Sequence, residues 1–256
     1  MRHVLTCCLG VAMVGLAAVP AATQSRRDAG AEWEEYNVEY DGRFTFVRIR
    51  FQPRSSFDGR WGRRDLKWDH DYPRAERHLA RILAEITAID PNASGSNILT
   101  LDDPEIFKYP VAYLAEPGFW TLSEEEREGL RAYLLKGGFL IVDDFVDTQW
   151  YNFEGRMRDV LPDARLIRLD ATHPVFHSFF EIDALDHRHP YWPAFESAFY
   201  GVFEDNDPQK RLMVIVNYNN DIGESWEWSD TGFLPIDITN EAYKLGVNYI
   251  VYAMTH

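Results

Sequence analysis

Two adjacent carboxylates at the end of an apolar run are the first residues in this chain that could do chemistry. Asp143 and Asp144 directly follow Phe139–Val142, and a glycine pair precedes that run. Neighbouring carboxyl groups raise one another's pKa and bind divalent ions through oxygen, so the pair could ligate a hard cation or act as acid and base. Alternatively, one aspartate caps a helix and the other is solvated, because adjacent residues in a strand point to opposite faces.

A second polar group, Asn217–Asp221, follows the apolar run Leu212–Val216. By itself such a group is typical of a turn. Both apolar runs are typical of buried parallel strands, however, and the carboxyl ends of such strands form the edge where open α/β sheets bind ligands. Amides and carboxylates meeting there could hold a polar ligand such as a sugar, or a calcium-like ion. The ligand-binding residues predicted for this edge and the segment after it are Asp143, Asp144, Asn219, Asn220, Asp221, Trp226 and Glu227.

Aromatic residues stand close to these polar groups in the sequence. The chain has 8 Trp, among them Trp226 and Trp228 and those in the loop 61–68. Aromatic rings beside acids and amides suit carbohydrate, which stacks on them. The alternative for each Trp is that it packs over the end of the sheet as part of the core.

The histidines give weaker signals. His173 and His177 have helical spacing, but no Glu accompanies them in the zinc-protease pattern, so no metal site is assigned to them. His70 stands between Asp69 and Asp71 and would have a raised pKa if those acids are close; it is either an acid/base group or an ordinary loop residue. Neither a phosphate-binding glycine loop nor a Gly-x-Ser-x-Gly elbow occurs, so we predict no cofactor beyond a divalent cation on the aspartates.

The first residues have the order of a secretory signal peptide. Met1–Ala22 contains a short basic start, an apolar run and then small residues, and the run is shorter and more interrupted than the roughly 20 residues of a membrane span. We therefore expect an exported protein, periplasmic or secreted, with no membrane span after cleavage. Both cysteines, Cys7 and Cys8, would leave with this segment, which excludes disulfides and thiolate nucleophiles. The net charge of −15 disfavours nucleic acid and anionic lipid as partners.

Strand and helix patterns alternate along the rest of the chain. After a linker at 23–42, residues 44–51 alternate as a strand, and Pro73 opens a helix with apolar residues at three- and four-residue spacing. Ser123–Glu126 is a capping box for a helix that ends before Gly137. This alternation predicts one α/β domain over 43–256, with three layers and a mainly parallel sheet covered by helices on both faces. Further strands are expected at 97–101, 111–115, 139–142, 164–168, 199–203 and 212–216, and further helices at 150–161 and 241–254.

Several sequence blocks, in one order from about Phe44 to His256, resemble a bacterial family of domains of unknown function, DUF4159. They include Asp71-Tyr72-Pro73, LRAYLLKGGFLIVDDF at 130–145, His173-Pro174-Val175-Phe176, Asn219-Asn220-Asp221 and Leu245-Gly246-Val247-Asn248. The resemblance implies a flavodoxin-like fold similar to the class I glutamine amidotransferase superfamily, in a group without an established activity. Enzymes of that superfamily use a Cys on a strand-to-helix elbow. The mature chain would have none, so their glutaminase chemistry does not carry over.

Two functions are compatible with these residues. The first is a non-catalytic ligand-binding or assembly module, whose acidic and aromatic rim holds a polar small molecule, a glycan or a partner protein. The second is a hydrolase acting on a glycan-like substrate, with Asp143 or Asp144 as base and a bound divalent ion. Carboxylates facing each other at about 5 to 9 Å across an open cleft would favour hydrolysis. Carboxylates buried against Arg or helix N-termini would favour a structural role.

Overall fold

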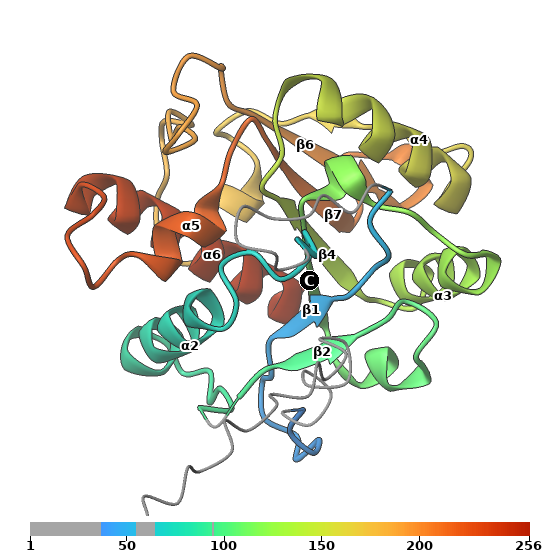
Figure 1. Cartoon of the computed structure of the whole chain (residues 1–256), viewed down its shortest axis with the longest axis horizontal. Helices are drawn as coiled ribbons and strands as arrows, with labels where there is room; N and C mark the ends of the chain where they lie inside the picture. The colour runs from blue at the N-terminus through green and yellow to red at the C-terminus, as the bar shows by residue number, and fades with distance from the viewer. Residues whose placement is uncertain (1–36, 55–64, 94) are drawn as a thin grey trace, which may run out of the picture.

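The computed structural model describes residues 37–54, 65–93 and 95–256, which form a seven-stranded sheet with helices on both faces (Figure 1). The α/β class with a mostly parallel sheet is therefore confirmed. The predicted signal peptide, most of the predicted linker and Trp61 lie outside the described residues. The strands are β1 (Val47–Ile49), β2 (Asn97–Leu99), β3 (Val111–Ala115), β4 (Phe139–Asp143), β5 (Ile167–Arg168), β6 (Ala198–Phe203) and β7 (Leu212–Tyr218).

The strands lie side by side in the order β2-β1-β3-β4-β7-β6-β5. The first five in this order are parallel to their neighbours, whereas β6 pairs antiparallel with both β7 and β5. The reversal at β6 follows from the chain, because the residues between Phe203 and Leu212 are too few for the crossover that a parallel pair needs. The predicted strand after Gly138 is β4, which lies at the centre between β3 and β7 with all its residues buried.

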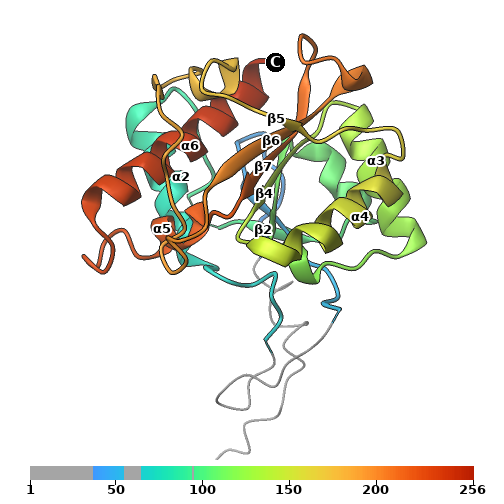
Figure 2. The same cartoon turned by 90° about the horizontal axis from the view of Figure 1, so that it is seen from above.

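Helices cover the two faces of the sheet as separate layers (Figure 2). Along β4, Phe139 and Ile141 pack on one face and Leu140 and Val142 on the other, as the alternation of side chains in a strand requires. The central strand is therefore apolar on both faces, which explains its unbroken hydrophobic sequence. The helices on one face are α2 (Arg74–Ile86), α5 (Ile222–Glu227) and α6 (Ile236–Thr255), and those on the other are α3 (Glu124–Leu135) and α4 (Trp150–Val160).

Several boundaries differ from those expected. The capping box of α3 is present, because Ser123 Oγ accepts from the Glu126 N–H while the Glu126 carboxylate accepts from the Ser123 N–H. Helix α6, however, begins at Ile236 instead of 241, since its first two residues are exposed and its first turn shows no apolar periodicity. Of the strand expected at 44–51, only Val47–Ile49 forms a regular strand, β1. The sequence did not predict helix α5. Within the described residues, no helix is both long and apolar enough to cross a membrane.

Candidate functional site

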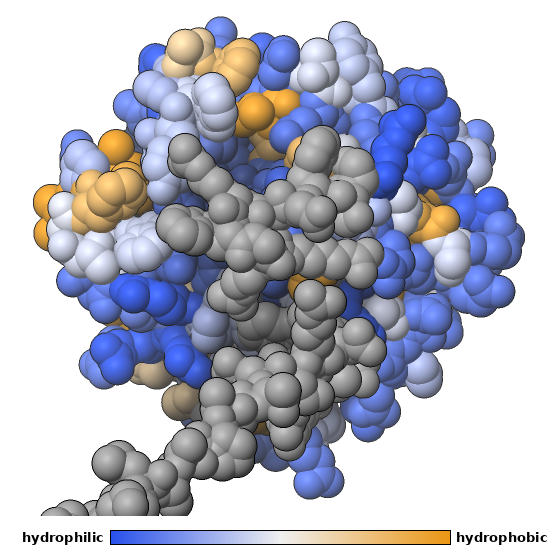
Figure 3. Space-filling model, viewed as in Figure 1, coloured by the Kyte–Doolittle hydropathy of each residue, from blue (hydrophilic) through white to orange (hydrophobic). Residues whose placement is uncertain are grey.

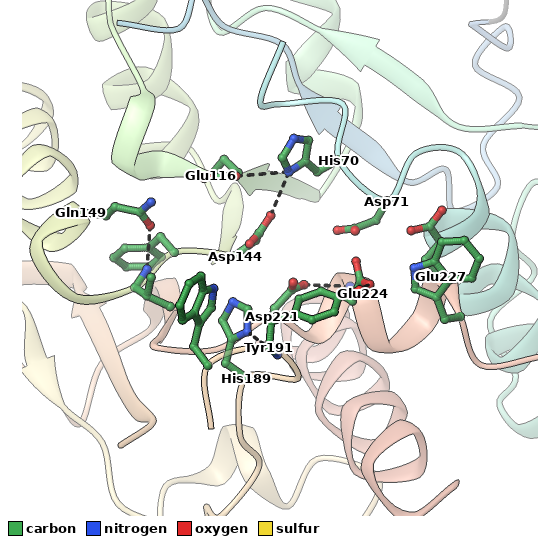
Figure 4. A pocket seen from close by; sticks show the side chains of 14 residues that line it. His70, Asp71, Glu116, Asp144, Gln149, His189, Tyr191, Asp221, Glu224 and Glu227 are labelled. Carbon is green, nitrogen blue, oxygen red and sulfur yellow. Dashed lines mark hydrogen bonds and ion pairs between the residues drawn. The ribbon is translucent and has the colours of Figure 1, made fainter. Parts of the chain in front are cut away.

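A cavity of about 470 Å³ lies at the carboxyl ends of the central strands (Figure 4). Its walls come from the loop after β1, the ends of β3 and β4, helix α5 and the irregular segment before β6. Strands β1 and β3 are neighbours but continue to opposite sides of the sheet, and such a switch point is where open α/β sheets bind ligands. The lining residues are His70, Asp71, Glu116, Asp144, Phe145, Val146, Gln149, His189, Tyr191, Trp192, Asp221, Glu224, Glu227 and Trp228.

The backbone around the cavity adopts an unusual conformation at several points. Asp71, Glu116, Asp144 and Asn219 have φ angles of 64°, 50°, 59° and 55°, in the left-handed region that residues other than glycine rarely enter. Glu116, Asp144 and Asn219 are the first residues after β3, β4 and β7, so the left-handed conformation occurs where each of these strands ends. Each such residue costs on the order of 1 kcal/mol, and strained residues cluster at functional sites in proteins.

His70 is held between acids on both of its ring nitrogens. Its Nε2 lies 3.0 Å from Asp65 Oδ1, and its Nδ1 lies 3.2 Å from Glu116 Oε1 and 3.7 Å from Asp144 Oδ2. Burial by itself lowers the pKa of His70, but the hydrogen bonds to Asp144 and Glu116 outweigh it and raise that pKa to about 11. The Nδ1, Glu116 and Asp144 ligand atoms lie within 4.8 Å of one another, close enough to share a metal ion.

His189 belongs to a second group, with Asp144 and Asp221, whose ligand atoms also lie within 4.8 Å of one another. Its Nδ1 accepts a hydrogen bond from the Tyr191 N–H at 3.2 Å, so the neutral ring carries its proton on Nε2. Burial lowers the pKa of His189, which favours this neutral form. In this tautomer Nε2 carries an N–H group and cannot coordinate a metal ion, so His189 is not a metal ligand in this arrangement.

Three further acids, Asp71, Glu224 and Glu227, form a third group within the same distance. Glu224 accepts a hydrogen bond from the Tyr191 hydroxyl, whereas Oδ2 of Asp71 is buried without a hydrogen-bond partner. Burial, together with repulsion from Asp144, raises the pKa of both Asp71 and Asp221 well above the usual range. The cavity is thus lined by six carboxyl groups, and among its lining residues only the two histidines could carry a positive charge.

Asp143 lies beneath the cavity and is fully buried. Its Oδ2 accepts from the Tyr113 hydroxyl at 2.7 Å and from the N–H groups of Ile222 and Gly223 at 2.9 and 3.0 Å, while its Oδ1 accepts from Asn217 Nδ2 at 3.1 Å. Burial raises the pKa of Asp143 to about 6 although these hydrogen bonds oppose the rise. Asp143 therefore fastens the start of α5 to the end of β4.

The comparison with protein families identifies the family to which this domain belongs. The model of the family described as Domain of unknown function (DUF4159) matches residues 45–254. The chain belongs to this family. The DUF4159 match covers every strand and all but the last residue of α6, so the cavity lies wholly within the family domain. No curated protein matches the chain.

The residues predicted for the site are divided between the cavity and the core of this DUF4159 domain. Asp144, Asp221 and Glu227 line the cavity. The others are next to it but engaged elsewhere: Trp226 is fully buried and its Nε1 donates to the Ala242 carbonyl. Asn219 bridges two segments, Asn220 accepts from the Asp221 N–H, and Asp143 holds α5.

Several cavity residues were missed or left undecided. Glu116 follows β3 directly, so the rule that drew attention to Asp143 would also have found it. His70 was noted for its acidic neighbours, but the carboxylates that contact it are Asp65, Glu116 and Asp144 instead of Asp69 and Asp71. The irregular segment contributes His189, Tyr191 and Trp192. Its richness in histidine and aromatic residues is visible in the sequence, but no motif assigns these three residues to the site.

Proposed function

We propose that this DUF4159 domain is an exported module that binds a polar ligand beside a divalent cation held by His70, Glu116 and Asp144. The observation that carries the proposal is the position of His70. A metal-binding histidine usually donates its second ring N–H to a carboxylate, and Asp65 occupies that place at Nε2. Nδ1 faces Glu116 and Asp144. One nitrogen and two carboxylates suit zinc, manganese or a similar divalent ion.

The charge of the cavity supports a bound cation. Six carboxyl groups line it, and a buried carboxyl group must be protonated, paired with a positive charge or bound to a metal ion. At the end near Glu116, the compensating charge comes from His70 and from Lys67, whose Nζ lies 3.5 Å from Glu116 Oε1. A divalent ion would replace the proton on His70 Nδ1 and offset the charges of the acids around it. The six are Asp71, Glu116, Asp144, Asp221, Glu224 and Glu227.

The aromatic wall supports a carbohydrate as the polar ligand. Tyr191, Trp192 and Trp228 line the cavity, and the side chain of Trp192 is 53% exposed. Phe233, in the connection between α5 and α6, contacts the rings of Tyr191 and Trp228 and extends this wall outside the cavity. Phe233 and Ile236 are 60% and 77% exposed, and Figure 3 shows hydrophobic patches on this side of the molecule. A sugar ring could stack on such a wall while its hydroxyl groups reach the acids.

The strand order supports a flavodoxin-like arrangement as part of the proposal. The parallel strands follow the order 2-1-3-4 and then the fifth parallel strand, β7, which is the order of flavodoxin-like sheets. Such sheets bind their ligands between the first and third strands. His70 and Glu116, which come from the segments after these two strands, meet there. Relation to the class I glutamine amidotransferase superfamily and export through the N-terminal signal belong to the same proposal.

A hydrolase is the second candidate, and Asp221 is the observation that favours it. Asp221 is 4% exposed and lies near Asp144, and an acid with a raised pKa beside a second carboxyl is the pattern of acid/base pairs. Asp144 would help the cation to activate water, and Asp221 would protonate the leaving oxygen. Asp143 does not reach the cavity and would have no part in this chemistry.

Calorimetric titration of the EDTA-treated full chain with Zn²⁺ and with Mn²⁺ tests the cation site. Glu116→Gln should lower the affinity at least tenfold because it removes a ligand and keeps the shape. Glu125→Gln, which makes the same change of charge on the exposed side of α3, should leave the affinity unchanged. Equal affinity in the wild type and Glu116→Gln would overturn the proposed site.

Incubation of the cation-loaded protein with soluble polysaccharides separates the two candidate functions. Binding without release of reducing ends favours the binding module. Release of reducing ends that Asp221→Asn abolishes, with cation affinity retained, favours the hydrolase. If the polysaccharides neither bind nor react, carbohydrate is not the ligand.

A further inference from the structure

One end of the cavity is not used by the proposed cation. Glu224 and Glu227, three residues apart on α5, face Asp71 from the loop before α2. Oxygens of the three carboxyl groups lie within 4.8 Å of one another. Figure 4 shows this group on the opposite side of the cavity from His70 and Glu116, with the Asp71 carboxyl pointing inward.

Asp71 is the residue in this group whose side chain has an unsatisfied buried oxygen that a ligand could contact. Its side chain lines the cavity, the residue is only 8% exposed, and its Oδ2 has no hydrogen-bond partner. A buried carboxylate oxygen in this state is unfavourable. Gly223 permits the position, because a Cβ there would lie 2.5 Å from Asp71 Oδ2. The absence of a side chain on α5 therefore leaves room for Oδ2 of Asp71, a buried oxygen that no hydrogen bond in the described residues satisfies.

The arginines near this group are engaged with other acids. Arg48 is buried in an ion pair with Glu76 and donates to the carbonyls of Trp68 and His70. Arg74 pairs with Asp230 at 2.5 Å, and its guanidinium stacks over Trp228. Neither forms an ion pair with Asp71 or Glu227 in the described residues. Their charge still acts from a distance, because Arg48 opposes the rise in the pKa of Asp71 and both arginines oppose that of Glu227. This end of the cavity therefore has no direct partner of the kind that His70 and Lys67 give Glu116.

We propose that Asp71, Glu224 and Glu227 form a second cation site, which takes a hard divalent ion such as Ca²⁺ or Mg²⁺ through oxygen alone. Three carboxylates without a nitrogen or sulfur ligand are the donor set that these ions prefer. The hydroxyl of Tyr191 donates to the Glu224 carboxylate and would orient it toward the ion.

The two sites together would offset most of the charge that six ionised carboxyl groups carry. The first cation takes Glu116 and Asp144 as ligands, which leaves four of the six lining carboxyl groups. A second divalent ion at the far end offsets two of these four charges. The second site does not depend on the first, because the two share no ligand.

Titration of the EDTA-treated full chain with Ca²⁺ and with Mg²⁺ tests the second site. One ion should bind per chain, and Glu227→Gln should lower the affinity at least tenfold. Glu227 is partly exposed, so the isosteric amide should not prevent folding. Glu125→Gln and Glu116→Gln should leave the affinity within twofold. Tyr191→Phe, at a half-exposed position, should weaken binding severalfold and gives a second readout if Glu227→Gln misfolds.

The outcomes separate this inference from the proposed function. If neither ion binds, or if Glu116→Gln abolishes Ca²⁺ binding while Glu227→Gln does not, the second site is wrong whatever happens at the first. If Glu227→Gln loses Ca²⁺ but Zn²⁺ binding is insensitive to Glu116→Gln, the second site stands and the first fails. Binding of a primary amine such as putrescine in place of Ca²⁺, with loss in Glu227→Gln, would also overturn the assignment to a metal.

Discussion

Two adjacent aspartates at the end of β4 should respond to mutation in different ways. Asp143 accepts four hydrogen bonds in the core, whereas Asp144 turns into the cavity among other acids. Asp143→Ala should therefore destabilise the protein, although it removes none of the acids that line the cavity. Asp144→Asn should change the stability of the cation-free protein little, because the repulsion from neighbouring acids that it removes is offset by the loss of its interaction with protonated His70. Asn is suitable at this position because it tolerates the left-handed conformation.

The size of the first effect follows from the donors that Asp143→Ala would leave buried. They are the Tyr113 hydroxyl, the Asn217 amide and the N–H groups of Ile222 and Gly223. At about 1 kcal/mol each, the lower end for an unsatisfied buried donor, they sum to about 4 kcal/mol. Removing a buried charge offsets part of this, so we expect a net loss of about 3 kcal/mol. For a domain of this size, that corresponds to a fall in Tm of about 6 to 12 °C.

Thermal unfolding followed by circular dichroism in EDTA at pH 7 measures both variants. The same samples titrated with Zn²⁺ should show that Asp144→Asn has lost the ion although its Tm is intact. The distinction between the two aspartates would be refuted by a Tm for Asp143→Ala within about 2 °C of the wild type. An equal fall in Tm for both variants would also refute it.

Three further predictions concern the surroundings of the site. Asp65→Asn should weaken Zn²⁺ binding about tenfold with little change in Tm, because Asp65 orients His70 without contacting the ion; calorimetry would show an unchanged affinity if this role is wrong. Arg48→Met should destabilise the protein by about 3 to 5 kcal/mol in urea unfolding, because it leaves the Glu76 carboxylate buried and unpaired; full stability in the variant would contradict this. In EDTA, stability should rise as the pH falls from 7 toward 5, because the raised pKa values of the cavity acids mean that these groups bind more protons in the folded state than in the unfolded state. His187 and His189, whose pKa values burial lowers, oppose this rise, but the acids are more numerous. A Tm that falls steadily over the range would contradict this, and saturating Zn²⁺ should flatten the rise.

The sequence predicts the sheet well because its strongest signals are local. The glycine pair and apolar run before Asp143 predict β4, and the similar run at 212–216 predicts β7; the structure places the two side by side and parallel. The direction of β6 could also have been inferred, because the connection to β7 is too short for a crossover. Helix α5 escaped prediction because it is only six residues long and is held by Asp143, a contact between distant parts of the chain.

The site is harder to predict because it is assembled from segments without periodicity. Which of Asp143 and Asp144 faces the cavity depends on the left-handed conformation of Asp144, for which the sequence gives no pattern. His189 and Tyr191 reach the cavity from an irregular segment whose path depends on contacts with distant parts of the chain, such as Glu224 on α5 and Asn248 on α6. A high tryptophan content does not show which tryptophans belong to a site. Trp226 is buried in the core, whereas Trp228, two residues later, lines the cavity.

Because residues in the left-handed conformation lie at the strand ends, mutations that increase the stability of the fold could remove the acids of this site. Glycine adopts positive φ freely, so Glu116→Gly or Asp144→Gly would relieve backbone strain at the same moment as it deletes a ligand. Selection for thermal stability alone would therefore favour substitutions of the cavity's acids over substitutions in the core. Any engineering of this domain for expression or heat resistance should hold Asp71, Glu116, Asp144 and Asn219 fixed. Family members that have glycine at these positions are expected to keep the fold and to have lost the cation.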